Sequence, residues 1–435
     1  MQRQRQRSLG LRAWFQHPQL RPQVKVLWVL LGLVLLGMSL QSFQRGYSSG
    51  HFEDFTLGGH KLLRGLNPYG QFFQCGPYFY SIFCGWLFGV IDFLPHPLGL
   101  FLYRLASWVL LGEVTAQWLL TGFQAAPQKK SNCAAAAIAI LGTSELLGGV
   151  SCAKLEVLMM AGLMWAGLAW QRHPILSGAV AASMVNFKFF PLAPVGLLAV
   201  ALLNQKKRGH GQHVKFVLSC LITFSALALA PLLVYGPKLA LTMMHTQKAS
   251  LSAYTLEHYA QFLSIFGFLT SILGKPPSVN ASLAIAGMTA LFLIGLMLWC
   301  RISSSEKALW AIALGSLYAT NFNLLSQKNS FITGYPGLLF GVMLCCGGGT
   351  TLSLTRVQQG LLRFSVGFYW IIVSYIHSDL FPKLGREWAS HYHIKPLGSF
   401  VLMFFLALVL WQHRQDASRD QPKSSPVEAA LPSPA

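Results

Sequence analysis

The sequence predicts an all-α polytopic membrane protein with about 12 transmembrane helices of about 20 residues each, the length that crosses about 30 Å of hydrocarbon. Of its 435 residues, 53% are hydrophobic and only 11% are charged. The formal charge of +20 comes from 33 Lys+Arg against 13 Asp+Glu. In such a chain a basic excess favours positively charged cytoplasmic loops over nucleic-acid binding. The 8 cysteines lack the spacing of a zinc site or a disulfide framework.

The N-terminal segment, residues 1–25, is predicted to be a basic cytoplasmic tail. Its aromatic residues Trp14 and Phe15 are expected to lie against anionic lipid headgroups. The apolar run Val26–Leu40 is expected to be a retained signal anchor, because no small-x-small cleavage site follows it closely. The first loop, residues 42–77, is therefore placed on the extracytoplasmic side.

This first loop is expected to contain an amphipathic helix over Phe55–Leu66 that lies in the membrane interface. Asp54 would precede its first turn, and Pro68 would follow its end. Apolar and polar side chains separate onto two faces of this helix: Phe55, Leu62 and Leu66 on one, and Leu57, His60, Lys61 and Arg64 on the other.

The membrane domain is predicted to cover residues 26–412, and residues 413–435 form a polar tail expected to be disordered. The spans after the first are expected at residues 78–94, 98–120, 134–150, 155–170, 175–203, 216–235, 283–300, 308–325, 331–346, 364–378 and 397–411. Both termini would then be cytoplasmic, in the plasma (inner) membrane. Residues 236–280 are expected to form an outer loop.

One of these spans has an alternative. Pro191 interrupts helices, and Lys188 would be unfavourable at the centre of a bilayer. Residues 187–191 could therefore form the tip of a re-entrant hairpin between residues 175 and 203. The basic loop at residues 205–215 is cytoplasmic in either case.

The candidate catalytic residue is Asp54, because a carboxylate at the outer mouth of a helix bundle can act as a general base. The structural alternative is that it caps the helix that follows. Glu53 beside it is a candidate for substrate contact and the carboxylate expected to be lost with little consequence.

Cations near these acids are candidates for binding a phosphate. His60, Lys61 and Arg64 could form such a clamp or could anchor the helix to headgroups. Lys188 is expected to have an intramembrane functional role, because aromatic residues and a proline flank it.

For the other polar residues in apolar segments, a structural role is favoured over a catalytic one. Lys154 is expected to neutralise Glu156 or Glu145. Lys328 and His258 lie in polar outer segments that could contact a sugar or pyrophosphate, although ordinary loops have the same composition. Tyr69 is a further candidate for substrate contact.

Two blocks give the sequence a resemblance to a known family. The first combines Asp54 with Arg64-Gly65-Leu66-Asn67-Pro68-Tyr69 and Gly76-Pro77-Tyr78-Phe79-Tyr80. The second combines Ser177-Gly178-Ala179 with Asn186-Phe187-Lys188-Phe189-Phe190-Pro191. Together they resemble the glycosyltransferase family 87 (DUF2029) membrane proteins, of GT-C-like architecture. The sequence departs from that family's late outer block at Leu325–Ser330.

The resemblance implies a glycosyltransferase that moves a mannose-like hexose or a pentose from a polyprenyl-phosphate donor. The acceptor would be a lipid-linked or cell-envelope glycan on the extracytoplasmic side, and Asp54 would act as base in an inverting transfer. No cofactor is expected, and a divalent cation stays open. Two alternatives remain: a transporter or flippase of lipid-linked intermediates, and a non-catalytic subunit of envelope assembly.

Overall fold

The computed structural model describes residues 10–16, 20–44, 47–73, 76–78, 80–123, 128–203, 207–258, 264–300, 302–322, 328–349, 354–376 and 382–419. Its helices are α1 (Gly10–Gln16), α2 (Pro22–Leu40), η2 (Gln41–Phe43), α3 (Gly50–Leu63), α4 (Ile82–Ile91), α5 (His96–Gly122), α6 (Gln128–Leu141), α7 (Thr143–Ser151), α8 (Leu155–Ala169), α9 (Pro174–Phe187), α10 (Leu192–Ala201), α11 (Lys207–His258), α12 (Ile265–Leu273), α13 (Val279–Trp299), α14 (Ser304–Phe322), η4 (Lys328–Gly334), α15 (Tyr335–Cys345), α16 (Arg356–Tyr369), η5 (Trp370–Tyr375), α17 (Lys383–His391) and α18 (Lys395–Arg419). Two short strands, β1 (Phe72–Phe73) and β2 (Gly76–Pro77), pair antiparallel.

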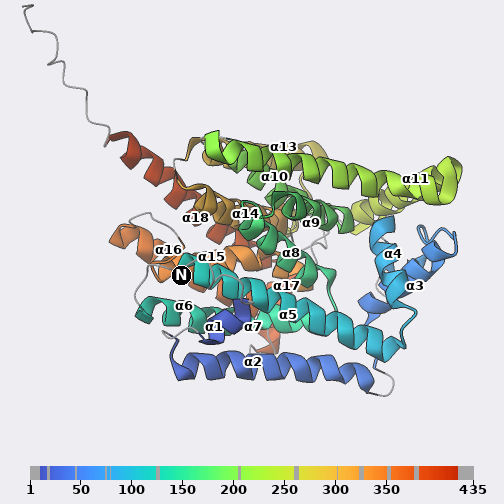
Figure 1. Cartoon of the computed structure of the whole chain (residues 1–435), viewed down its shortest axis with the longest axis horizontal. Helices are drawn as coiled ribbons and strands as arrows, with labels where there is room; N and C mark the ends of the chain where they lie inside the picture. Colours follow the sequence, from blue (N-terminus) through green and yellow to red (C-terminus); the bar gives the residue numbers. More distant parts are fainter. Residues whose placement is uncertain are drawn as a thin grey trace, which may run out of the picture.

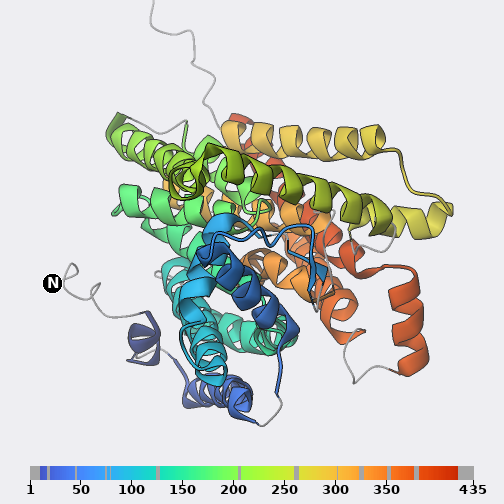
Figure 2. The same cartoon turned by 90° about the vertical axis from the view of Figure 1, so that its right-hand side faces the viewer.

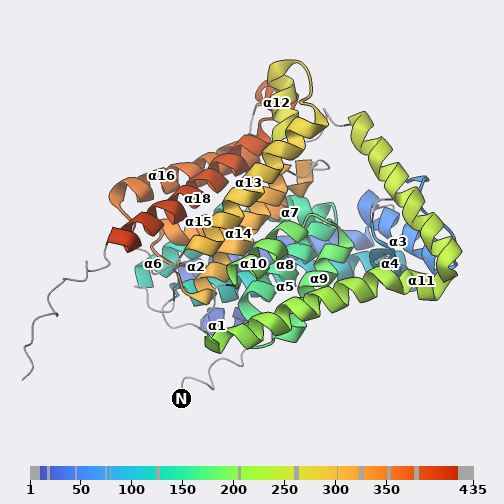
Figure 3. The same cartoon turned by 90° about the horizontal axis from the view of Figure 1, so that it is seen from above.

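The helices form one bundle around α14 (Figures 1 and 3). From Glu306 to Phe322 nearly every side chain of α14 is buried, because helices α10, α15 and α18 pack around it. A helix that is apolar on all sides belongs in the interior of a bundle. The core therefore lies along α14.

Membrane character is supported by five helices that are long and apolar enough to cross a bilayer. They are Pro22–Phe43, His96–Gly122, Gly211–Tyr254, Val279–Trp299 and Lys395–Gln412. The bent pair Lys130–Leu141 and Thr143–Ser151 raises the number to 6 if it forms one span. Four other predicted spans, over residues 78–94, 155–170, 175–203 and 331–346, contain apolar helices of 10–17 residues in the described part of the chain, so the expected 12 spans stay a prediction.

Helices α2 and α5 run antiparallel and define the two ends of the bundle. Arg104 Nη1 donates to the carbonyl oxygen of Met38 at 3.1 Å, and the Leu11 amide donates to Glu113 Oε2 at 2.7 Å. Helix α5 therefore begins at the end of the bundle where α2 finishes. We call this the α3 end, because α3 and α4 lie there (Figure 1).

The predicted span over residues 78–94 is not supported as a crossing, because α4 lies at the α3 end (Figure 1). With 10 residues it is also too short to cross a bilayer. It packs on α3 as a helical hairpin through glycines: a Cβ added at Gly89 would lie 2.7 Å from the carbonyl oxygen of Gly59. The apolar residues of this segment are explained by the packing of α4 on α3.

The segment 175–203 matches the hairpin alternative, because α9 and α10 run in opposite directions. Ile175 and Ala199 both contact the first part of α11: Ser219 Oγ donates to Ile175 O at 2.6 Å, and His213 Nε2 lies 3.0 Å from Ala199 O. Phe187, at the far end of α9, stacks on Phe83 of α4 at 5.3 Å. The chain thus reverses at residues 188–191, which lie toward the α3 end.

The expected outer loop at residues 236–280 is largely helical. Helix α11 continues to His258 after a kink at Gly236, whose φ of 75° and ψ of 156° are not helical. Figure 3 shows α11 turning sharply at this point, and Figure 2 shows its second half crossing above α3. The buried Met243 fixes this half against Leu62 and Tyr78, so tertiary packing turns the expected loop into a cover for the α3 end.

Both terminal segments also differ from expectation. Trp14 does not lie against lipid: it is 2% exposed and packs edge-on against Trp28, with ring centroids 6.2 Å apart. Helix α18 continues to Arg419, beyond residue 413 where disorder was expected. Residues 420–435 lie outside the described part of the chain.

Candidate functional site at the α3 end

Helix α3 places Asp54 inside a helix, so the predicted helix start at residue 55 is wrong. The helix begins at Gly50, where the backbone of Ser49 is extended. Phe52 and Phe55 are both buried, at 1% and 0% exposure, and their packing draws the earlier residues into the helix. Asp54 is therefore not the N-cap, and the residue is only 6% exposed.

The far end of α3 corrects the second boundary. Leu66 lies beyond the last residue of the helix and is 54% exposed, so it does not share the buried face of Phe55 and Leu62. The apolar face that was expected to rest in the membrane interface packs on α4 instead.

A buried ion pair joins two segments far apart in the sequence. Lys188 follows α9, and its Nζ lies 2.7 Å from Glu156 Oε1 at the start of α8. The Glu156 side chain is 2% exposed and the Lys188 side chain 28%, so the carboxylate is enclosed while part of the lysine is accessible. The ammonium also lies over the ring of Tyr80 at 5.0 Å, and that ring meets Phe55 of α3 edge-on at 4.5 Å.

His51 connects this ion pair to α3. Burial first, and then the positive charges of Lys154 and Lys188, lower the pKa of His51 to about 4. Glu156 acts in the opposite direction. His51 is thus neutral near pH 7 and lies among the charges of the α8 and α9 ends. Asp54 follows it by one helical turn, the spacing that brings side chains onto one face.

The turn before α8 places a second lysine beside Glu156. Lys154 is 4% exposed and immediately precedes α8, after Ala153, which has a positive φ of 48°. We define the α3-end cluster as His51, Asp54, Lys154, Glu156 and Lys188. Its two lysines and two carboxylates have formal charges that cancel.

The predicted pairing of Lys154 with Glu156 or Glu145 is incomplete, because each carboxylate has another lysine as its direct partner. The carboxylate of Glu156 pairs directly with Lys188, although Lys154 acts on it electrostatically. Glu145 lies 3.7 Å from Lys395, in a separate buried pair that joins α7 to α18. Charged residues within apolar segments indicated that such pairs exist. The sequence did not show which acid pairs with which base.

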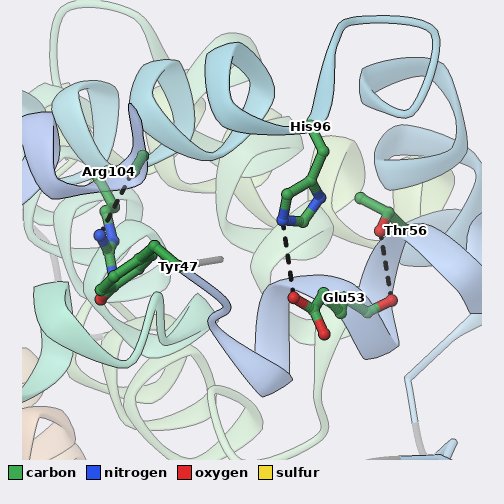
Figure 4. A network of polar contacts seen from close by, with 6 residues as sticks. Tyr47, Glu53, Thr56, His96 and Arg104 are labelled. Carbon is green, nitrogen blue, oxygen red and sulfur yellow. Dashed lines mark hydrogen bonds and ion pairs between the residues drawn. The ribbon is translucent and has the colours of Figure 1, made fainter. Parts of the chain in front are cut away.

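Glu53 and His60 lie outside the α3-end cluster, on the side of α3 that faces the α4–α5 connection. Glu53 Oε1 is 3.7 Å from His96 Nε2, and His60 Nδ1 is 2.9 Å from Asp92 Oδ2. Figure 4 shows the first of these pairs, with Thr56 donating to the backbone oxygen of Glu53. Both contacts fasten α3 to its neighbours.

The other predicted ligands of the first loop have structural surroundings. Lys61 donates to Gln71 Oε1 and lies 5.1 Å from the ring centroid of Phe73. Arg64 ends α3 and is exposed. Tyr69 is buried, its hydroxyl donates to Tyr80 O at 2.8 Å, and burial raises its pKa well above the usual value. Within the described part of the chain, none of these three residues has a hydrogen bond or ion pair with a member of the α3-end cluster.

Two further candidates fall on segments whose side chains are outside the description. Lys328 begins η4, and His258 is the last residue of α11. Their predicted contacts with a sugar or pyrophosphate stay predictions.

Arg104 is a buried charge that the sequence reasoning missed, within the long apolar segment of α5. Its guanidinium donates to Met38 O, Ser42 Oγ, Tyr47 OH and Ser151 O. It also lies 4.8 Å from the ring centroid of Tyr47 (Figure 4). Arg104 therefore holds the ends of α2 and α7 beside the α3-end cluster.

The cluster offers two cations for an anion and a buried carboxylate for a proton transfer or a hydrogen bond. Among the described residues, no group of three or more His, Cys, Asp or Glu side chains could hold a metal ion.

Comparison with known proteins returns no match: no family model, no curated protein and no solved structure matches this chain. The resemblance to glycosyltransferase family 87 stays a prediction carried by the two sequence blocks.

Proposed function

We propose that the protein is a membrane glycosyltransferase that transfers a sugar from a polyprenyl-phosphate donor to a glycan acceptor. The observation that carries the proposal is the position of Lys188. It stands at a helix break, paired with the buried Glu156 at 2.7 Å, and 28% of its side chain is exposed at the end of the bundle that holds Asp54. A fixed, partly accessible cation is suited to binding the phosphate of a lipid donor.

The reaction requires few groups. The acceptor hydroxyl attacks the anomeric carbon of the sugar, the bond from that carbon to the phosphate oxygen breaks, and the polyprenyl phosphate leaves with the bonding electrons. Asp54 accepts the hydroxyl proton, and Lys188 and Lys154 stabilise the charge that develops on the phosphate. Attack opposite the leaving group inverts the anomeric configuration.

The basic residues support an extracytoplasmic position for this site. Arg21, Lys130 and Lys215 are exposed at the opposite end of the bundle, where the Arg21 amide donates to Asn132 Oδ1 at 2.8 Å. By the positive-inside rule that end would be cytoplasmic, with both termini. About 12 spans in a GT-C-like arrangement are part of the same proposal.

The test is sugar transfer by the full chain reconstituted in proteoliposomes, with radiolabelled polyprenyl-phosphate mannose, glucose or arabinose and lipid extracts as acceptor. The Asp54→Asn variant should lose transfer by at least about 100-fold, within the usual range for loss of a general base. The Glu53→Gln variant is the matched control and should stay within about threefold of the unmodified protein.

The same assay separates the alternatives. Transfer by a folded Asp54→Asn variant at the unmodified rate would refute the assignment of the base. Movement of the labelled lipid across the bilayer without transfer would indicate a flippase. Assembly function that survives both Asp54→Asn and Lys188→Met would indicate a non-catalytic subunit.

A further inference from the structure

Glu156 has an unused hydrogen-bond acceptor. Its Oε1 receives Lys188 Nζ at 2.7 Å, whereas Oε2 is buried and has no hydrogen-bond partner among the described residues. The whole residue is 1% exposed. Most buried polar atoms in proteins have a partner, so an unsatisfied carboxylate oxygen needs an explanation.

The surroundings of Glu156 favour its charged form. Lys188 pairs with it directly, and Lys154 lies close enough to act on it electrostatically. A carboxylate next to two cations is a strong hydrogen-bond acceptor. The group fits a binding role better than the role of general base, which the proposed function gives to Asp54.

The ion pair also determines what can reach Oε2. The ammonium of Lys188 is partly accessible, and Glu156 lies behind it. A phosphate that contacts Lys188 is held next to Glu156, because the ammonium lies 2.7 Å from Oε1, so the group attached to that phosphate is the part of a ligand nearest to Oε2. In a polyprenyl-phosphate donor, the group attached on one side is a sugar ring with several hydroxyl donors.

We propose that Glu156 Oε2 accepts a hydrogen bond from a hydroxyl of the donor sugar, which makes Glu156 a specificity-determining residue for a neutral sugar ring. The inference rests on the proposed function, because it places the donor phosphate at Lys188. A uronic acid should bind more weakly than the neutral sugar, since it adds a second carboxylate near that of Glu156. A hydroxyl at one ring position is required, since its loss leaves Oε2 unsatisfied again.

The experiment measures binding, with no need for turnover. The full chain in detergent is titrated with farnesyl-phosphoryl mannose, glucose and arabinose, and the tightest ligand becomes the parent of a series of monodeoxy analogues. One deoxy position should weaken binding to the unmodified protein by about 10- to 100-fold, as for a hydrogen bond to a charged group. The corresponding uronosyl ligand should bind at least as weakly.

The Glu156→Gln variant shows whether the lost affinity comes from a contact between that hydroxyl and Glu156. It should bind the parent and that deoxy analogue with affinities within about threefold of each other, because the charged acceptor is gone. Farnesyl phosphate, which has no sugar, should bind Glu156→Gln at least as tightly as the unmodified protein, because Lys188 is released from its partner. Glu113→Gln, at the opposite end of α5, is the matched control and should keep the discrimination.

A purely structural role for Glu156 gives a different result. Glu156→Gln would then weaken the binding of all ligands by the same factor, and both proteins would discriminate equally between the parent ligand and its deoxy analogues. That outcome overturns the inference. If Glu156→Gln does not fold, the unmodified protein still tests the inference. The inference is also overturned if no single deoxy position weakens binding to the unmodified protein. Binding with discrimination but no transfer would refute only the proposed function, and transfer without discrimination would refute only this inference.

Discussion

The ammonium of Lys188 lies 2.7 Å from the carboxylate of Glu156, although 32 residues separate them in the chain. This contact joins the tip of the α9–α10 hairpin to the first turn of α8. A buried pair of this kind is sensitive to the loss of one member, because the other charge is left without its partner.

Lys188→Met should therefore lower the free energy of unfolding by about 3 kcal/mol, at the lower end of the range for breaking a buried pair. The double variant Lys188→Met/Glu156→Met should recover most of this loss, because no charge is then left alone. Thermal unfolding of the purified variants in detergent measures both effects. Equal stability of Lys188→Met and the unmodified protein would contradict the structural importance of this pair.

His51 predicts a dependence of stability on pH. The folded-state pKa of about 4 lies below the ordinary histidine value of 6.5, so the unfolded chain binds more protons than the folded protein between these values. The free energy of unfolding should consequently fall as the pH decreases from about 6.5 to about 4, by up to about 3 kcal/mol from this residue.

His51→Gln should remove this part of the pH dependence, since glutamine does not titrate. The measurement is the unfolding temperature of both proteins at pH 7, 6, 5 and 4.5 in one detergent. His245→Gln, at an exposed position on α11, is the control and should retain the full dependence. Parallel curves for His51→Gln and the unmodified protein would count against a neutral, half-buried His51.

The glycine contact between α3 and α4 predicts a steric effect. A methyl group at Gly89 would approach the backbone of Gly59 to 2.7 Å, closer than real contacts allow, so Gly89→Ala should separate the two helices. We expect a loss of about 1–3 kcal/mol, as for overpacking a tight core. Gly37→Ala in α2 has nothing within 4 Å of the new methyl group and should be neutral or slightly stabilising.

Limited proteolysis of the first loop and thermal unfolding measure this difference. If Gly89→Ala were as stable and as resistant to protease as Gly37→Ala, the close packing of α3 on α4 would be wrong.

We expect that a positive charge at position 104 is not sufficient for full stability of the fold and that the guanidinium geometry is also needed. Its guanidinium reaches four oxygen atoms on η2, α7 and nearby segments, and a lysine offers one compact ammonium in place of that planar fork. Arg104→Lys should lower the free energy of unfolding by about 2 kcal/mol, as expected when buried acceptors lose their donors.

Arg356→Lys is the control, because Arg356 is exposed at the start of α16. Its unfolding temperature should match that of the unmodified protein. A similar result for Arg104→Lys would show that the fork geometry is unimportant.

Hydropathy alone was sufficient to predict the all-helical class and the long apolar segments. Runs such as Val26–Leu40 and Leu98–Leu120 correspond to α2 and α5, because the length of a span is a local property of the chain. The helix break at Lys188 and Pro191 was also predictable, since proline restricts its own backbone and removes a donor.

What the sequence could not decide is which segments stay at one end of the bundle. Helix α4 is as apolar as a span, but its packing on the glycines of α3 keeps it beside Asp54. The same packing starts α3 at Gly50 and encloses Asp54 within the helix. The apolar character of a segment shows only that its side chains favour leaving water. It does not distinguish burial in lipid from burial in the protein interior, because both are apolar.

The pairing of charges was decided by the tertiary structure alone. Sequence proximity favoured Lys154 as the partner of Glu156, whereas the reversal of the chain after α9 brings Lys188 to Oε1 and leaves Oε2 without a described partner. Local sequence determines which residues are charged and buried. Their partners depend on where distant helices end, and that is fixed only when the whole bundle packs.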